Sequence, residues 1–183
     1  DCLIINKSII TKEHLEQLPK LKYVGLQSTG YNVIDCDAAK ERGIVVSNIP
    51  AYSTAAVAQL VFALIMQFTN KVTVHSDAVH NGEWTKCPDF CFWKSPLAEL
   101  DGKTIGIIGF GSIGQRVANI AKAFGMNVVV YTTHPKPEQY SDVAFCSLNE
   151  LLKSSDFVTC HCPLTPSTEG IINKDSLSKM KNT

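Results

Sequence analysis

The sequence predicts an α/β fold, in which helices cover sheets of parallel strands. Short apolar segments alternate with amphipathic segments along the whole chain. The segments between successive strands are long enough to hold a crossover helix, which is typical of parallel pairing. A glycine-rich motif, Gly109-Phe110-Gly111-Ser112-Ile113-Gly114, lies where one apolar strand gives way to an amphipathic helix.

The composition is that of a folded protein without net charge. The chain has 183 residues, which suits one large domain or two small ones. Hydrophobic residues make up 45% and charged residues 19%, so a buried core can form. Lysine and arginine together number 17, as do aspartate and glutamate. This balance gives no electrostatic reason to expect a nucleic acid or an anionic membrane as partner.

The N-terminal segment and the cysteines favour a soluble, cytoplasmic protein. Asp1–Ile5 is typical of a strand and not of a signal peptide. The longest apolar run, residues 55–68, is too short to span a bilayer and is interrupted by Gln59 and Gln67. The seven cysteines are odd in number and lack the spacing of a disulfide framework or a zinc site. We therefore expect free thiols and no bound metal.

Three strands and two helices are predicted in the first fifty residues. The strands lie at residues 2–6, 23–27 and 44–47, and the helices at residues 12–18 and 36–42. Thr11 and Asp35 are the predicted N-caps, because their side chains accept hydrogen bonds from the first helical amides. Pro19 stops the first helix, and Gly43 ends the second one as its C-terminal glycine.

A long apolar helix and an irregular segment are predicted next. The helix starts at Ser53 or Thr54 and reaches about Phe68. It is apolar nearly all round, so we expect it to be buried against a domain or a second subunit. Residues 75–96 are rich in aromatic and turn-forming residues and are predicted to be an irregular connection. The predicted domains are residues 1–96, with a linking helix at 53–69, and residues 97–183.

The strand–helix alternation resumes in the second domain. Strands are predicted at residues 104–108, 126–131 and 157–162. A helix runs from Ser112 to Phe124, and a last one begins at Asn173. Between them, Ser147 and Glu150 have the spacing of a capping box that opens a short helix.

The glycine motif predicts a dinucleotide-binding site, since its context of strand, turn and helix is satisfied. At each of the three glycine positions of the motif there is a physical reason for the absence of a side chain. Gly109 permits the tight turn, Gly111 lets the backbone approach a pyrophosphate, and Gly114 lets the helix pack closely on the strand. The amides at Ser112 and Ile113 begin the helix and would face the phosphates with a favourable dipole. The cofactor is therefore predicted to be NAD or NADP, bound by a doubly wound Rossmann sheet.

The residues after the second strand of this unit leave the choice of cofactor open. An acidic residue normally ends that strand and binds the ribose hydroxyls of NAD. Here Thr132 and Thr133 stand at that point, followed by His134 and Lys136. A 2′-phosphate would be tolerated there and could be paired. Alternatively, a threonine hydroxyl binds the ribose of ordinary NAD.

Two further loops follow the carboxyl ends of strands, where ligands bind in open α/β sheets. In the second domain, Cys162 ends the last strand and Pro163 follows it, and His161 is interpreted as a structural histidine. In the first domain, Thr29 and Gly30 follow a strand, and their amides could form a concavity for a small carboxylate.

With these residues placed, the chain resembles the D-isomer-specific 2-hydroxyacid dehydrogenases along nearly all of its length. The resemblance rests on segments of both predicted domains: residues 21–24, 28–35, 41–48, 55–58, 99–111 and 161–165. The aromatic residues of 89–93 and the non-acidic 131–133 look closest to the glycerate dehydrogenase (hydroxypyruvate reductase) subgroup.

The resemblance implies a partial flavodoxin-like substrate domain, followed by the Rossmann cofactor domain. Thr29 and Gly30 would bind the carboxylate of a 2-oxo or 2-hydroxy acid through their amides. Val57 would approach the nicotinamide. The linking helix and the cofactor domain would take part in a homodimer.

The resemblance also implies hydride transfer between NAD(P)H and a small 2-oxo acid, with hydroxypyruvate and D-glycerate as the expected pair. The family's catalytic Arg, Glu and His are expected beyond Thr183, so no residue of this chain is assigned a catalytic role, and the chain is expected to be an inactive fragment that lacks both ends. The alternative is a corepressor-like or regulatory protein that binds a dinucleotide without turnover.

Overall fold

The computed structural model describes residues 1–182, which form two compact units. The first consists of Asp1–Ser53 together with Pro163–Ile171, and the second of Thr54–Cys162 and the segment from Ile172. The division at Ser53 differs from the domain boundary expected at residue 96. The reason is that the long helix after Ser53 packs on the second sheet, so it is compact with that sheet and not with the first one.

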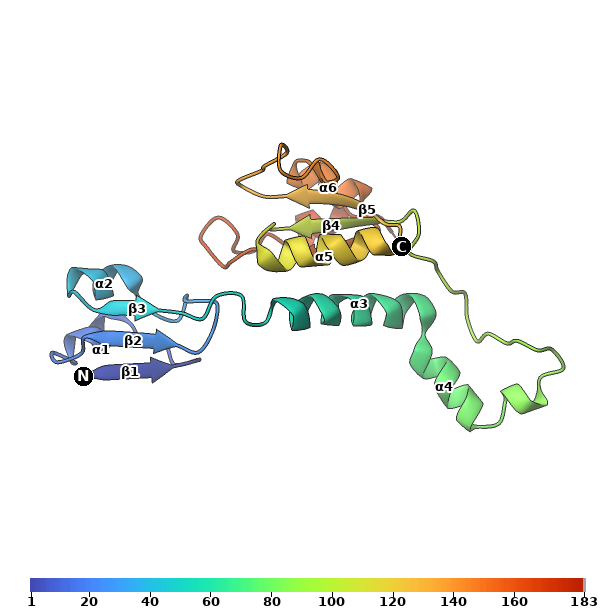
Figure 1. Cartoon of the computed structure of the whole chain (residues 1–183), viewed down its shortest axis with the longest axis horizontal. Coiled ribbons are helices and arrows are strands. Elements are labelled where there is room, and N and C mark those ends of the chain that lie inside the picture. Colours follow the sequence, from blue (N-terminus) through green and yellow to red (C-terminus); the bar gives the residue numbers. More distant parts are fainter. Residues whose placement is uncertain (183) are drawn as a thin grey trace. The chain divides into compact units, whose positions relative to one another are not determined.

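The first unit is a three-stranded parallel sheet in the order β1-β2-β3 (Figure 1). Its elements are β1 (Cys2–Ile5), α1 (Lys12–Glu16), β2 (Tyr23–Leu26), α2 (Cys36–Glu41) and β3 (Val45–Ser47). The predicted caps are confirmed: Thr11 is the N-cap of α1, and the Asp35 carboxylate accepts the Ala38 amide at 2.9 Å. Leu15 and Val24 are fully buried in the core of this unit.

The second unit contains a four-stranded parallel sheet in the order β6-β5-β4-β7. Its strands are β4 (Thr104–Ile108), β5 (Asn127–Tyr131), β6 (Ala144–Phe145) and β7 (Phe157–Cys160). Numbered from β4, this is the order 3-2-1-4 of a Rossmann sheet. The order reverses between β4 and β7, and this switch point is where such sheets bind ligands.

Helices α5 (Ser112–Ala123), α6 (Leu148–Ser154) and α7 (Lys174–Ser178) follow strands of this sheet. The predicted capping box is confirmed, because the Ser147 hydroxyl accepts the Glu150 amide and the Glu150 carboxylate accepts the Ser147 amide. Strand β6 was not predicted, since a two-residue strand has too few residues to show an alternation.

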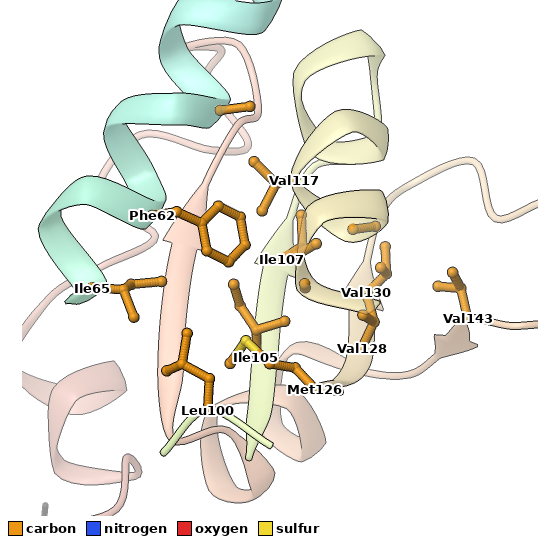
Figure 2. Close-up of a cluster of buried hydrophobic side chains, with 13 residues drawn as sticks. Phe62, Ile65, Leu100, Ile105, Ile107, Val117, Met126, Val128, Val130 and Val143 are labelled. Atoms are coloured by element: carbon orange, nitrogen blue, oxygen red, sulfur yellow. The ribbon is translucent and has the colours of Figure 1, made fainter. Parts of the chain in front are cut away.

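The long helix α3 (Thr54–Asn70) covers one side of the second unit. Figure 2 shows Phe62 and Ile65 pointing from α3 into the cluster that contains Ile107 and Val117. Phe62 also stacks on Phe124, with ring centroids 5.5 Å apart.

The expectation that α3 is buried against a domain or a second subunit is confirmed on one side of the helix, where Phe62 and Ile65 pack into the core. Leu60, Leu64 and Phe68 are 58%, 54% and 76% exposed. These three side chains, called here the outer face of α3, are spaced four residues apart. They therefore follow one stripe of the helix, and the buried residues Phe62 and Ile65 lie on another.

The prediction of irregular structure over residues 75–96 is wrong in its first part. Helix α4 (Val72–His80) and the 3₁₀ turn η1 (Trp84–Lys86) occupy much of it, and irregular chain follows. The β-branched residues Val72, Thr73 and Val74 have low helix propensity, so the sequence does not indicate that a helix begins there. Lys71, at φ +49°, separates α4 from α3.

Among residues 1–182, no single helix is both long enough and apolar enough to cross a membrane. Helices α3 and α4 meet that test only when taken together, and they are bent by 60° at their junction.

Candidate dinucleotide-binding site

The turn from β4 into α5 has the geometry that a pyrophosphate cradle requires. Gly109 has φ +93°, a conformation that side chains with a Cβ rarely adopt, and its amide donates to the Tyr131 carbonyl at 2.8 Å. A Cβ on Gly114 would lie 2.3 Å from the Gly109 carbonyl oxygen. A side chain on Gly114 would push the helix away from the strand, and one on Gly109 would strain the turn, so the two glycines keep it tight.

Gly111 differs from the other two glycines of the motif. A Cβ built on it meets nothing within 4 Å, and its φ of −78° is open to any residue. Protein packing therefore gives no reason for glycine at this position. The empty space in front of the backbone is what a closely approaching phosphate group needs.

The amides that begin α5 lie next to this space. Gly111 is the N-cap of the helix, and Ser112 is its first residue. The first amides of a helix have no carbonyl partner within the helix, and they carry the positive end of its dipole. Ser112 is exposed and Ile113 is half-buried, which leaves this end of the helix accessible. The residues present therefore fit a dinucleotide phosphate.

The end of β7 closes the other side of the switch point. A Cβ on Gly109 would lie 2.5 Å from the backbone nitrogen of Cys162 and 2.7 Å from the carbonyl carbon of His161. The His161 amide donates to the Ile108 carbonyl at 2.7 Å, so the pairing with β4 continues one residue past the strand.

The interpretation of His161 as a structural residue is supported by its surroundings. Its Nε2 lies 2.8 Å from the Thr159 hydroxyl, and burial lowers the pKa of the imidazole below its usual value. Burial therefore favours the uncharged ring, which agrees with a structural role.

The two threonines after β5 form a hydrogen-bonded turn. The Thr132 hydroxyl accepts the His134 amide at 3.4 Å, and the Thr133 hydroxyl lies 2.9 Å from Nδ1 of His134. Because the Gly109 amide donates to the Tyr131 carbonyl at the end of β5, this turn and the glycine loop lie at the same edge of the sheet.

The remaining predicted site residues lie apart from the glycine loop in sequence, and they fall in different units. Val57 is half-buried in the first turns of α3, in the second unit. Pro163 belongs to the first unit, where its carbonyl accepts the Thr168 hydroxyl at 2.6 Å.

Thr29 and Gly30 lie in the loop after β2, also in the first unit. The Thr29 hydroxyl donates to the Ile49 carbonyl at 3.1 Å, and the Asn48 amide group donates to the Thr29 carbonyl at 2.8 Å. Within residues 1–182, the backbone amides of Thr29 and Gly30 have no protein acceptor. The loop is thus held by its carbonyl and hydroxyl groups, which leaves two neighbouring amides as donors.

Sequence reasoning missed two residues beside the glycine loop, Gln115 and Tyr140. Both line a cavity that also includes Gly111 and Thr132. Gln115 looks like an ordinary surface residue of an amphipathic helix. Tyr140 lies in a loop of no recognisable pattern, so no sequence signal could have found it.

The cysteines carry no bridge in this structure. All seven are free thiols. Among residues 1–182, no group of three or more His, Cys, Asp or Glu side chains is placed to hold a metal ion.

The sheet order and the glycine turn at its switch point define a Rossmann-type dinucleotide-binding protein. Residues 62–183 match the NAD-binding domain of the D-isomer-specific 2-hydroxyacid dehydrogenases. The chain belongs to this family, as the resemblance predicted.

Relatives of known name agree with this assignment. The chain is 46% identical over 183 residues to a hydroxypyruvate reductase of Blautia hydrogenotrophica, and the match covers all of this chain and 57% of that protein. A solved D-lactate dehydrogenase of Aquifex aeolicus, in complex with NAD and lactic acid, superposes with a TM-score of 0.88 at 34% identity, covering 98% of this chain and 53% of that one.

A second solved structure, an acyclic imino acid reductase in complex with NADPH and D-Arg, has a TM-score of 0.86 at 35% identity. It covers 99% of this chain and 57% of its own. The chain thus spans somewhat more than half the length of the relatives that it matches. Their complexes hold NAD in one case and NADPH in the other.

Proposed function

We propose that the protein transfers a hydride between NAD(P)H and a small 2-oxo acid, reducing hydroxypyruvate to D-glycerate. The observation that carries the proposal is the glycine cradle at the switch point of a Rossmann sheet, in a chain of this family. The choice of substrate is supported by the 46% identity to a hydroxypyruvate reductase.

The second unit is the proposed cofactor domain. The Ser112 and Ile113 amides bind the pyrophosphate in front of Gly111, while Gly109 and Gly114 keep the turn close to the sheet. Further cofactor contacts from this unit are assigned to Val57, Thr132, Thr133 and Cys162. When bound, the reduced nicotinamide supplies the hydride.

The first unit is the proposed part of the substrate domain. The free amides of Thr29 and Gly30 bind the substrate carboxylate, since two neighbouring N–H groups match its two oxygens. The Asn48 and Thr29 side chains hold this loop in place through the bonds described above. The chain's own role is thus to bind and orient both reactants, and no proton donor is assigned to it.

The proposal extends to assembly and location. The outer face of α3 is apolar and exposed in the single chain, and a second copy of the protein would cover it in a homodimer. A cytoplasmic location agrees with seven free thiols, because reducing compartments keep cysteines unpaired.

The test is turnover by the purified protein of natural length. NADH or NADPH is mixed with hydroxypyruvate or glyoxylate, and the loss of absorbance of the reduced nicotinamide is followed. The chirality of the glycerate formed from hydroxypyruvate is determined. The proposal expects D-glycerate, and no turnover in the Gly111→Val variant. Tight dinucleotide binding without turnover of any 2-oxo acid would contradict it and favour a corepressor-like role. L-Glycerate as product would contradict the family's stereochemistry.

A further inference from the structure

A cavity of about 240 Å³ lies between the glycine loop and the turn after β5. It is lined by Phe110, Gly111, Gln115, Thr132, His134, Lys136 and Tyr140. We propose that this cavity receives a phosphate group on the ribose 2′ oxygen, so that the protein binds NADP(H) in preference to NAD(H). The inference rests on the proposed dinucleotide binding and adds the identity of the cofactor.

The charge of the lining favours an anion. Lys136 supplies a positive charge, His134 supplies an imidazole nitrogen for a hydrogen bond, and none of the lining residues is acidic. Asp142, which lies shortly after Tyr140 in the chain, is paired with Lys122. An acidic residue after β5 would bind the ribose hydroxyls of NAD and repel a 2′-phosphate, and this chain has Thr132 and Thr133 there instead.

The turn presents its donors in a defined arrangement. Nδ1 of His134 is engaged with the Thr133 hydroxyl at 2.9 Å, so Nε2 is the ring nitrogen left for a ligand. The Thr132 hydroxyl accepts the His134 amide at 3.4 Å and still has its own proton to donate. A phosphate in the cavity would therefore meet an imidazole, a hydroxyl and an ammonium group.

The aromatic part of the lining is held in place by contacts within the protein. Phe110 packs edge to face against Tyr140, with centroids 5.0 Å apart, and against Phe145 at 5.6 Å. The Gln115 side chain donates to the Phe110 carbonyl at 3.1 Å, which fixes its position beside Gly111. A cavity that is already shaped does not require the protein to reorganise, and this favours the affinity of the ligand that fills it.

The size of the preference follows from charge-assisted hydrogen bonds to a group that NADH lacks. One such bond made by a partly exposed side chain is worth roughly a factor of ten in affinity. The dissociation constant of NADPH is therefore expected to be at least about 10-fold below that of NADH at neutral pH and low salt.

The experiment is calorimetric titration of the protein with NADPH against NADH, and with the probe 2′,5′-ADP against 5′-AMP, which lacks only the 2′-phosphate. The ligand that carries the 2′-phosphate should bind more tightly in each pair. Lys136→Ala should reduce this ratio about 10-fold, and Thr132→Asp should reverse it by repulsion of the 2′-phosphate. Lys153→Ala, which changes an exposed lysine on α6, is the matched control and should leave the ratio as it is. The melting temperature of each variant checks its folding.

The outcomes separate the inference from the proposed function. Equal affinities, or tighter binding of NADH, would overturn the preference while leaving dinucleotide binding intact. A preference for NADPH that survives both Lys136→Ala and Thr132→Asp would place the 2′-phosphate elsewhere and overturn the assignment of the cavity. Failure of every dinucleotide to bind would contradict the proposed function itself.

Discussion

Gly109 and Cys162 approach so closely that no side chain fits between them. A Cβ on Gly109 would lie 2.5 Å from the Cys162 nitrogen, although the two residues are far apart in sequence. They follow β4 and β7, the two strands between which the order of the sheet reverses. The floor of the proposed cofactor site is thus a direct backbone contact across the switch point.

This contact predicts a large effect of Gly109→Ala on stability. The variant carries the cost of a positive φ, about 1–2 kcal/mol, and a steric clash with backbone that cannot rotate away, about 1–3 kcal/mol. Gly102→Ala is the matched control, since Gly102 has φ +71° and nothing within 4 Å of an added Cβ. Denaturant unfolding should show the larger loss for Gly109→Ala. Equal losses would mean that the contact with Cys162 carries no energy.

In contrast to Gly109, Gly111 predicts that a substitution mainly affects cofactor binding and has little effect on stability. A Cβ there meets no protein atom within 4 Å and φ is ordinary, so Gly111→Val should lower the unfolding free energy by no more than about 1 kcal/mol, the cost of a branched residue at the N-cap of α5. The same variant should weaken NADH and NADPH binding by about 100-fold or more, because its side chain occupies the proposed phosphate space. Fluorescence titration measures this loss. Unchanged affinity would mean that the pyrophosphate does not bind in front of Gly111.

How far the sequence predicted this site depends on whether the signal is local. The glycine loop and the Ser147 cap were predictable, because a turn, a cap and a strand–helix junction are each defined by a few neighbouring residues. The contact of Gly109 with Cys162 was not, since it depends on which strands become neighbours. The wall formed by Phe110 and Tyr140 was also out of reach, as loop conformation brings it together.

The same distinction applies to the helices α3 and α4. The apolar pattern of α3 predicted burial but could not tell one covered side from two, and Phe68 remains 76% exposed in the single chain. Helix α4 follows a break at Lys71 and starts with β-branched residues, so tertiary context had to override a weak local propensity.

Asp156 predicts a dependence of stability on pH. Its carboxylate accepts the Thr104 amide and the Lys181 ammonium, each at 2.8 Å, and these bonds hold the pKa of the carboxyl below its usual value, with the Lys181 bond having the larger effect. A pKa lowered in the folded state contributes stability above the unfolded-state pKa and loses it as pH falls through the folded-state pKa.

Asp156→Asn should therefore lower the free energy of unfolding by about 1 kcal/mol at pH 7, and the difference should shrink as pH falls below about 4. The matched control is Asp175→Asn, whose carboxylate is 75% exposed beside Lys179 and should matter much less. Urea unfolding at several pH values measures both variants. A constant difference across the pH range would show that the charge of Asp156 is not the cause.

The outer face of α3 predicts self-association. Phe68→Glu places a charge on this face and should convert a dimer to a monomer in sedimentation velocity, with the melting temperature lowered by loss of the dimer. Ile9→Glu is the control, since Ile9 is an apolar residue 69% exposed in the first unit. A monomeric protein before substitution, or a dimer unaffected by Phe68→Glu, would contradict the proposed homodimer.

The most direct test of the central claim is residue-resolved amide exchange of the chain with and without saturating NADH or NADPH. A dinucleotide whose pyrophosphate lies on the start of α5 should slow exchange at Ser112 and Ile113, whose amides have no partner within the helix. The amide of Thr133, in the turn after β5, should be protected less strongly. Binding that leaves Ser112 and Ile113 unprotected, or that protects only residues outside the switch point, would contradict the account.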